Sequence, residues 1–337
     1  MSDKKFVTAE ELEAARQDVL KNGGIHRTLG RVFLILCIIC CVGIIPMMAL
    51  QGSDTLSDAG AVPWVIFGFL VAGIFGFAIL AGVEDKKYMK FLNPYNTMYK
   101  TEFLPAIIHS RFEKIFAFEP QNGLSKEIVV RSDIFPSFDF IATNDYLRAS
   151  HNGVNFEYCD MQLQEEHTST DSDGDTHTSI VTVYMGLFLI VEFDHFVDTP
   201  LRIVSGGGKG NVTTESEVFN RDFSVECDSA VDALRILTPQ MMNDILEIKN
   251  YCKKPIYLAF FDDKIYFRVE PGRDLLEIAH DITKPISESR KQIDKDLDFI
   301  IGLLERLKFR NLKSEASRTK TSDKDFSGNA VYQNEQR

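Results

Sequence analysis

The sequence predicts an α+β protein in which a two-helix transmembrane hairpin precedes a domain with a mainly antiparallel β-sheet and flanking helices. Three observations support this fold class: two long stretches without charge, a later region of alternating apolar and polar residues, and amphipathic helical patterns near the end. At roughly 150 residues per domain, 337 residues suggest two units. The formal net charge of -12 argues against a dedicated nucleic-acid binder, so we expect no nucleic-acid partner.

The two membrane spans are expected at residues 32–50 and 61–83, neither of which contains a charged side chain. A helix rises about 1.5 Å per residue, so about 20 apolar residues cross a hydrocarbon core of about 30 Å. A signal peptide would place its apolar stretch nearer the start and end it at a small-residue cleavage site. A mostly polar segment comes first here, so we expect two true spans and a lipid bilayer as partner.

The charges that flank the spans predict their orientation. The connection over residues 51–60 contains Asp54 and Asp58 but no Lys or Arg. Positive residues stay on the cytoplasmic side of a membrane. We therefore expect a multi-pass membrane protein with both termini in the cytoplasm. The basic residues that flank the spans are Lys4, Lys5, Arg16, Lys21, Arg27 and Arg31 before the first span, and Lys86, Lys87, Lys90 and Lys100 after the second.

Small residues recur at every fourth position of the second span, at Gly68, Ala72 and Gly76. This spacing places all three on one helix face, where another helix can approach closely. We expect them to pack the two spans of one chain together. The alternative is that they pack the helices of a homo-oligomer.

The segments on either side of the spans predict helices. Residues 1–31 are expected to form a cytosolic helix that begins with a capping box of Thr8 and Glu11 and ends at Gly23 and Gly24. Residues 84–142 are expected to form a helical connector. Its clearest part is an apolar helical stripe over residues 96–117, entered or broken near Pro105.

Residues 143–311 are expected to form a cytosolic α+β domain, followed by a disordered polar tail over residues 312–337. A buried central strand is expected over residues 181–193. The other expected elements are strands within 144–150, 155–166, 201–205 and 222–228, a turn at 151–153, a helix opened by Thr238 and Pro239, a hairpin over 255–270 that turns at Asp262 and Asp263, and a helix over 287–308.

Four segments, taken in order, resemble a known family. They are FPSFDFIATNDYLRA, YMGLFLIVEF with Gly186, FSVECDSAVDALRILTPQMMNDILEI, and IYLAFFDDKIYFRV. The third contains Leu237-Thr238-Pro239 followed by Met241 and Met242. Over about residues 95–310, the chain is similar to the bacterial membrane protein family catalogued as domain of unknown function 3137. The resemblance implies two amino-terminal spans and a cytoplasmic α+β domain, and it implies no reaction.

The acidic segment HTSTDSDGDTHTS provides the metal-ligand candidates, Asp171, Asp173 and Asp175, with His167 and His177 on either side. Alternating carboxylates with a glycine resemble the start of a calcium loop, but the glycine stands at the fourth position and the twelfth position is threonine. The two histidines could instead bind a transition metal across a hairpin. We favour a solvated hairpin tip, and we expect no cofactor.

No G-x-S-x-G or H-E-x-x-H motif occurs in the chain, which favours a role without catalysis. The first functional hypothesis is a bacterial inner-membrane protein whose cytosolic domain acts as a protein-interaction or scaffolding module for another protein or for itself. The alternative is a membrane-tethered metal-dependent enzyme that uses the acidic hairpin. A weaker alternative is a subunit of an oligomeric channel or transporter, because two uncharged spans would need an oligomer to line a polar path.

Overall fold

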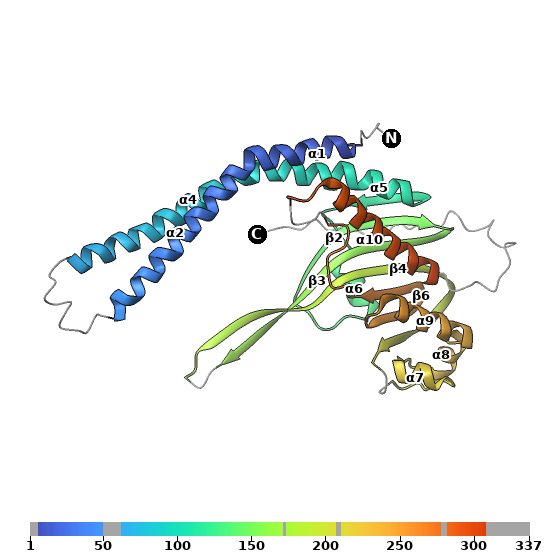
Figure 1. The fold of residues 1–337 in the computed structure, drawn as a ribbon. Helices are drawn as coiled ribbons and strands as arrows, with labels where there is room; N and C mark the ends of the chain where they lie inside the picture. The colour runs from blue at the N-terminus through green and yellow to red at the C-terminus, as the bar shows by residue number, and fades with distance from the viewer. Residues whose placement is uncertain (1–5, 50–61, 171–172, 207–209, 278–281, 308–337) are drawn as a thin grey trace. The chain divides into compact units, whose positions relative to one another are not determined.

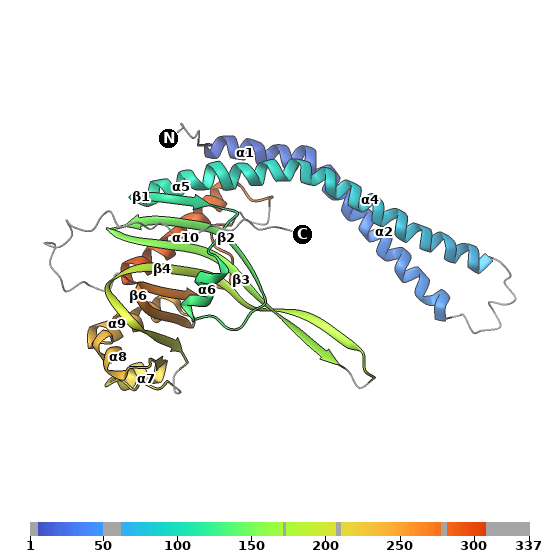
Figure 2. The ribbon, with the colours of Figure 1, turned by 180° about the vertical axis from the view of Figure 1, so that it is seen from behind.

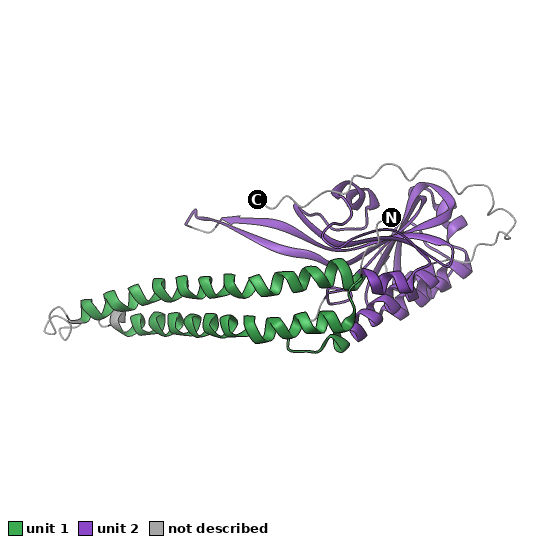
Figure 3. Cartoon of the chain, turned by 90° about the horizontal axis from the view of Figure 1, so that it is seen from above, with its two compact units in different colours: residues 1–104, 278–289 green, residues 105–277, 290–337 purple. Residues whose placement is uncertain are grey.

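The chain divides into two compact units (Figure 3). Unit 1 comprises residues 1–104 and 278–289, and unit 2 comprises residues 105–277 and 290–337. The computed structural model describes the residues 6–49, 62–170, 173–206, 210–277 and 282–307. The expected loop over 51–60, the candidate Asp171 and the expected tail over 312–337 therefore lie outside the described residues.

Two long, nearly continuous helical segments make up most of unit 1 (Figures 1 and 2). By length and composition both are apolar enough to cross a membrane, and their most apolar windows are not buried inside the chain. The first segment comprises α1 (Ala9–Asp18), the π-helical turn η1 (Val19–Gly23) and α2 (Gly24–Ala49). The second comprises α4 (Val62–Met98), the π-helical turn η2 (Tyr99–Phe103) and α5 (Leu104–Arg111), which belongs to unit 2 from Pro105 onward.

The expected end of the first helix at Gly23 and Gly24 is wrong, because α2 continues directly from η1. A Cβ atom added at Gly23 would lie 3.2 Å from the Cβ of Phe91 and 3.3 Å from Cδ2 of Tyr88. The glycine therefore allows a close approach to α4, and this tertiary contact outweighs its low helix propensity. The capping box that begins α1 is confirmed: the Thr8 hydroxyl accepts from Glu11 N, and the Glu11 carboxylate accepts from Thr8 N.

The apolar stripe expected as a helix over 96–117 is a helix only as far as Arg111. Pro105 does not break it, since the wider π-helical turn η2 directly precedes this residue and accommodates the missing donor. Residues Lys114–Glu119 instead form the edge strand β1. Over so short a segment, a strand with one covered face and an amphipathic helix give similar patterns of apolar residues in the sequence.

An ion pair between a buried arginine and a half-buried glutamate joins the two parts of unit 1. Arg16, only 4% exposed, donates to Glu13 and to the carbonyl oxygens of Ile282 and Thr283, at 2.7 and 3.2 Å. The carboxylate of Glu13 accepts a hydrogen bond of 3.0 Å from the backbone N–H of Ile286, the first residue of α10 (Ile286–Leu307). Glu13 thus caps the start of α10, where the helix dipole favours a negative charge.

Unit 2 is built on an antiparallel sheet with the order β1-β2-β3-β4-β5, and β6 pairs with β4. Helices α9 and α10 cross one face in Figures 1 and 2, and α6 lies on the opposite face. The α+β fold class is confirmed. The remaining elements are α6 (Lys126–Ser132), β2 (Phe140–His151), β3 (Val154–Thr170), β4 (Thr176–Ser205), α7 (Glu217–Asp222), β5 (Phe223–Glu226), α8 (Ala230–Ile236), α9 (Pro239–Cys252) and β6 (Ile256–Val269).

Several local predictions in unit 2 are confirmed. Asn152 and Gly153 turn between β2 and β3 with φ angles of 50° and 75°, as a two-residue hairpin requires. The hydroxyl of Thr238 caps α9 by accepting from Met241 N, and Pro239 occupies the first turn. Helix α10 extends over almost the expected residues. The short helices α6, α7 and α8 are not anticipated by the sequence analysis.

The predicted hairpin at Asp262 and Asp263 is confirmed by a contact within β6. The guanidinium of Arg268 lies 3.7 Å from the ring centre of Tyr257, eleven positions earlier in the chain. A straight strand would separate these residues by about 36 Å. β6 therefore doubles back on itself, and Asp262, with a φ angle of 55°, lies at its turn.

β4 pairs with both strands of the β6 hairpin. Its residues Leu187–Glu192 pair with Lys264–Val269, and Leu201–Val204 pair with Tyr257–Phe260. The segment expected as a separate strand at 201–205 is therefore the end of β4, which also pairs with β5. This one strand organises the sheet.

The hydrophobic core on the α6 face combines residues from the helix and from the middle of the sheet. It consists of Leu124, Val129, Ile134, Tyr146, Cys159, Met161, Leu163, Tyr184, Phe188, Ile190, Ala259 and Tyr266. The neighbouring positions along each strand face α10, whose Ile293, Leu297 and Ile300 are fully buried. Burial on both faces explains the nearly continuous apolar sequence of β4 after Tyr184.

The expectation of a buried strand over the whole of 181–193 is wrong at its start. Val181 is 45% exposed, and burial begins at Tyr184, which is 2% exposed. The reason is that the first part of β4 extends past the other strands as a two-stranded ribbon, as Figures 1 and 2 show. Apolar β-branched residues on that ribbon are therefore not covered by the sheet core.

Gly186 should be intolerant of any side chain. A Cβ atom there would lie 2.5 Å from the carbonyl oxygen of Val269 and 2.9 Å from Cα of Glu270, both backbone atoms of the paired segment. We expect Gly186→Ala to lower the free energy of unfolding by about 1–3 kcal/mol, the usual cost of overpacking. Denaturant unfolding of the full chain in neutral detergent, followed by circular dichroism, measures this change.

Met185→Ala is the matched control, because its side chain is 47% exposed. We expect it to change the free energy of unfolding by no more than about 0.5 kcal/mol. Equal stability of the two variants would contradict the close packing of β4 against β6 at Gly186.

Candidate functional site

The ribbon formed by β3 and β4 is an exposed part of unit 2, and we call it the arm. It comprises Gln164–Thr170 of β3 and Thr176–Thr182 of β4, which pair from Gln164 opposite Thr182 to Thr170 opposite Thr176. All residues from Glu166 to Thr170 and from Thr176 to Thr182 are exposed. The arm forms because both segments are rich in threonine and β-branched residues and meet at a turn with Gly174 at a φ angle of 89°.

The structure brings the two candidate histidines to the same face of the arm. His167 pairs with Ser179 and His177 pairs with Ser169, so the histidines are diagonal neighbours. Nε2 of His167 lies 3.5 Å from the Glu165 carboxylate. Among the described residues, no group of three or more His, Cys, Asp or Glu is arranged to hold a metal ion. Asp173 and Asp175 are exposed at the tip, and their role as ligands, like that of Asp171, stays a prediction.

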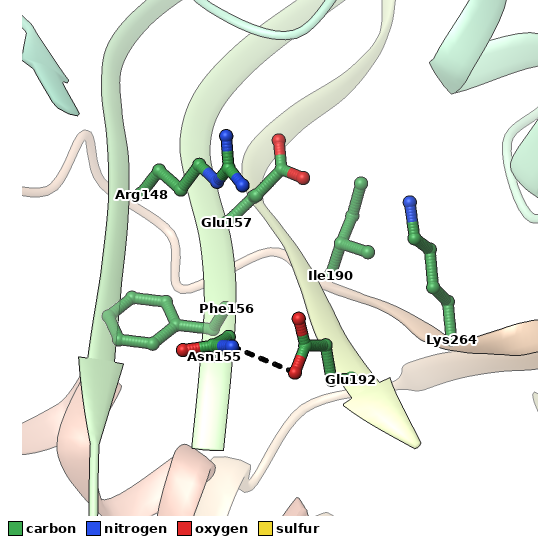
Figure 4. Close-up of a pocket in the computed structure, with 7 residues that line it drawn as sticks. All are labelled: Arg148, Asn155, Phe156, Glu157, Ile190, Glu192 and Lys264. Carbon is green, nitrogen blue, oxygen red and sulfur yellow. Dashed lines mark hydrogen bonds between the residues drawn. The ribbon is translucent and has the colours of Figure 1, made fainter. Parts of the chain in front are cut away.

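A shallow hollow lies on the sheet, far along β3 from the arm. Its lining comes from four strands: Arg148 of β2, Asn155, Phe156 and Glu157 of β3, Ile190 and Glu192 of β4, and Lys264 of β6 (Figure 4). The volume open to water inside it is about 10 Å³, the space of a single water molecule. This is far below the volume of a typical small-molecule pocket.

Opposite charges face each other across neighbouring strands in this hollow. Arg148 is in register with Glu157, and Glu192 is in register with Lys264. The amide of Asn155 donates to the Glu192 carboxylate at 2.9 Å, the bond drawn in Figure 4. Burial raises the pKa of Glu192, and the hydrogen bond from Asn155 opposes that shift. Cross-strand pairs of opposite charge stabilise a sheet, so we interpret the hollow as structural.

The seven lining residues include no Ser, Thr, Cys or His, and their formal charges cancel. The sequence analysis does not identify these residues. Their signal is a charged side chain within an apolar strand, but a sequence does not reveal which strand lies opposite. The register of β2, β3, β4 and β6 is what turns four isolated charges into two pairs.

The small residues of the second span lie on an open face of α4. A Cβ atom added at Gly68 or Gly76 would meet nothing within 4 Å, and Ala72 is exposed. The two helices of the chain instead approach at Gly73, where a Cβ atom would lie 3.0 Å from Sγ of Cys40. The expectation that Gly68, Ala72 and Gly76 pack the two spans of one chain together is therefore wrong, and packing against another helix stays a prediction.

The fold and its surface define a protein with an apolar helical hairpin and an α+β unit that extends an exposed arm. Residues 182–309 match the model of a family described as "Protein of unknown function (DUF3137)". This match supports the resemblance noted from the sequence over residues 182–309, which is part of the segment of about 95–310 that carries it. The matched residues begin at the end of the arm and include α9, β6 and α10.

Other comparisons add no functional assignment. No curated protein sequence matches the chain. A crystal structure of the mycobacterial trehalose monomycolate transport factor A, TtfA, aligns with 56% of this chain and 88% of its own, at 6% identity and a TM-score of 0.27. A TM-score this low does not establish a shared fold.

Proposed function

We propose that the protein is a membrane-anchored interaction module, in which the two apolar helices hold the α+β unit at the cytoplasmic face of a bacterial inner membrane. The observation that supports this function best is the arm, which extends an exposed two-stranded ribbon away from the sheet. An isolated two-stranded hairpin is marginally stable in water, and a partner strand or surface stabilises it. The arm therefore has the character of a docking element for another protein.

The anchoring part of the proposal rests on unit 1. The most apolar windows of its two helices are not buried by the rest of the chain, as a lipid environment requires. The excess of Lys and Arg outside the connection over 51–60 supports cytoplasmic termini. The open face at Gly68, Ala72 and Gly76 leaves room for a second membrane helix, and a homo-oligomer is one way to fill it.

Cysteine labelling from the two sides of the membrane tests the orientation. In a chain without its native cysteines, a membrane-impermeant maleimide should label Ser57→Cys in intact spheroplasts. Ser314→Cys should react only after the membrane is permeabilised. The reason is that the connection lies outside and the large unit inside. Labelling of Ser314→Cys in intact spheroplasts would contradict the proposed orientation.

Photocrosslinking in native membranes tests the interaction function. A benzoylphenylalanine residue placed at Thr178 of the arm should yield light-dependent adducts larger than the chain itself. The matched control is the same residue at Arg235, whose side chain is 75% exposed on α8, away from the arm. Adducts from Thr178 and none from Arg235 support docking at the arm. No adducts from Thr178, or the same adducts from both sites, would contradict it.

A further inference from the structure

The outer edge of β4 in the arm is an open edge of the sheet. On one side, Thr176–Thr182 pair with β3; on the other side, β6 joins β4 only from Leu187 onward. Among the described residues, no strand pairs with this edge. Alternate N–H and C=O groups of a β-strand point to each side, so the open edge presents a row of backbone donors and acceptors over about 23 Å.

The other edges of unit 2 carry protection that this edge lacks. β1 has a bulge between Ile115 and Ala117 and is followed by Pro120, and β5 has only four residues. The β3 edge of the arm is covered at its base, where Glu166 N donates to the Asp139 carboxylate at 2.8 Å. Proteins usually blunt exposed edges with Lys, Pro, bulges or short strands. Thr176–Thr182 has none of these and contains four β-branched side chains besides Thr182.

The sequence of the arm and of the turn that joins its two segments is also strongly acidic. Residues 164–182 contain five Asp or Glu residues and no Lys or Arg. The lack of basic residues extends further along the chain. No Lys or Arg occurs from Ala149 to Leu201, a stretch that includes ten acidic residues. A field of one sign steers oppositely charged partners and repels those of the same sign.

From the open edge and its charge, we propose that the arm binds an extended, cationic segment of a partner protein, which adds as a strand to the Thr176–Thr182 edge of β4. Main-chain hydrogen bonds along the edge provide affinity, and Lys or Arg side chains that flank the acidic arm provide selectivity. This inference rests on the proposed interaction function and names the chemistry of the partner. A second arm is a poor occupant of the edge, because two acidic ribbons repel each other.

A peptide binding assay on the purified full chain in neutral detergent tests this inference. The probes are three fluorescein-labelled nine-residue peptides: one of alternating Lys and Val, one of alternating Glu and Val, and the Lys–Val peptide with a central proline. Fluorescence polarisation reports binding. We expect the Lys–Val peptide to bind and the Glu–Val peptide not to bind. Proline removes a donor and disrupts strand pairing, so it should weaken binding at least about tenfold.

Two variants locate the binding edge. In the first, Asn-Gly replaces residues 166–180, which joins the paired residues Glu165 and Val181 by a two-residue turn and shortens the arm. The second, Thr178→Lys with Ile180→Lys, changes two exposed side chains and places cations on the edge itself. Each should weaken Lys–Val binding at least about tenfold while the unfolding midpoint of the chain stays within a few degrees. If the shortened chain does not fold, the lysine variant alone tests the binding edge.

The possible results separate the inference from the broader function. Equal binding of the proline and Lys–Val peptides, or unchanged binding by the lysine variant, would overturn strand addition at this edge. If the peptide binds only after residues 308–337 are deleted, the chain's own basic tail is the occupant, which also overturns the proposal of a partner segment. Crosslinks from Thr178 together with no peptide binding would refute the cationic-strand chemistry and leave the interaction function standing.

Discussion

The sheet of unit 2 depends on the backbone pairing of β4 with three other strands. Buried N–H and C=O groups must find partners. β4 supplies them to β3 and one strand of the β6 hairpin in its middle, and to β5 and the other strand of that hairpin near its end. Close backbone contact at Gly186 is part of this pairing, since a side chain there would meet the β6 backbone. Because β4 is longer than its neighbours, its first residues extend past them with β3 alone, and the arm results.

The same strand thus has two chemical characters. Between Tyr184 and Val191 it is buried on both faces except at Met185, and its side chains form the core with α6 and the sheet. Before Val183 it is exposed and mostly polar, with Ile180 and Val181 as exposed apolar residues. The change occurs at an irregularity in the β3–β4 register, between Leu163 and Gln164. A bulge at this point separates the rigid sheet from the ribbon that we propose as the docking element.

Much of this architecture could be predicted from local sequence signals. The capping box at Thr8, the turn at Asn152, the cap at Thr238 and the amphipathic pattern of α10 all depend on residues close in the chain. The errors arise where contacts between distant residues decide the outcome. Gly23 remains helical because α4 packs against it, and Val181 is exposed because no other strand reaches it. The charge pairs of the hollow depend on register, and the open edge depends on where β6 begins to pair. Neither is encoded locally.

Residue-resolved amide hydrogen exchange on the full chain in neutral detergent tests the central claim that the β4 edge of the arm is open. The account predicts that amides of Leu187–Glu192 are all strongly protected, because partners lie on both sides. Within Thr176–Thr182, it predicts that at least every second amide exchanges as fast as those of exposed turns. Protection of all seven amides to the level of the central segment would contradict an open edge.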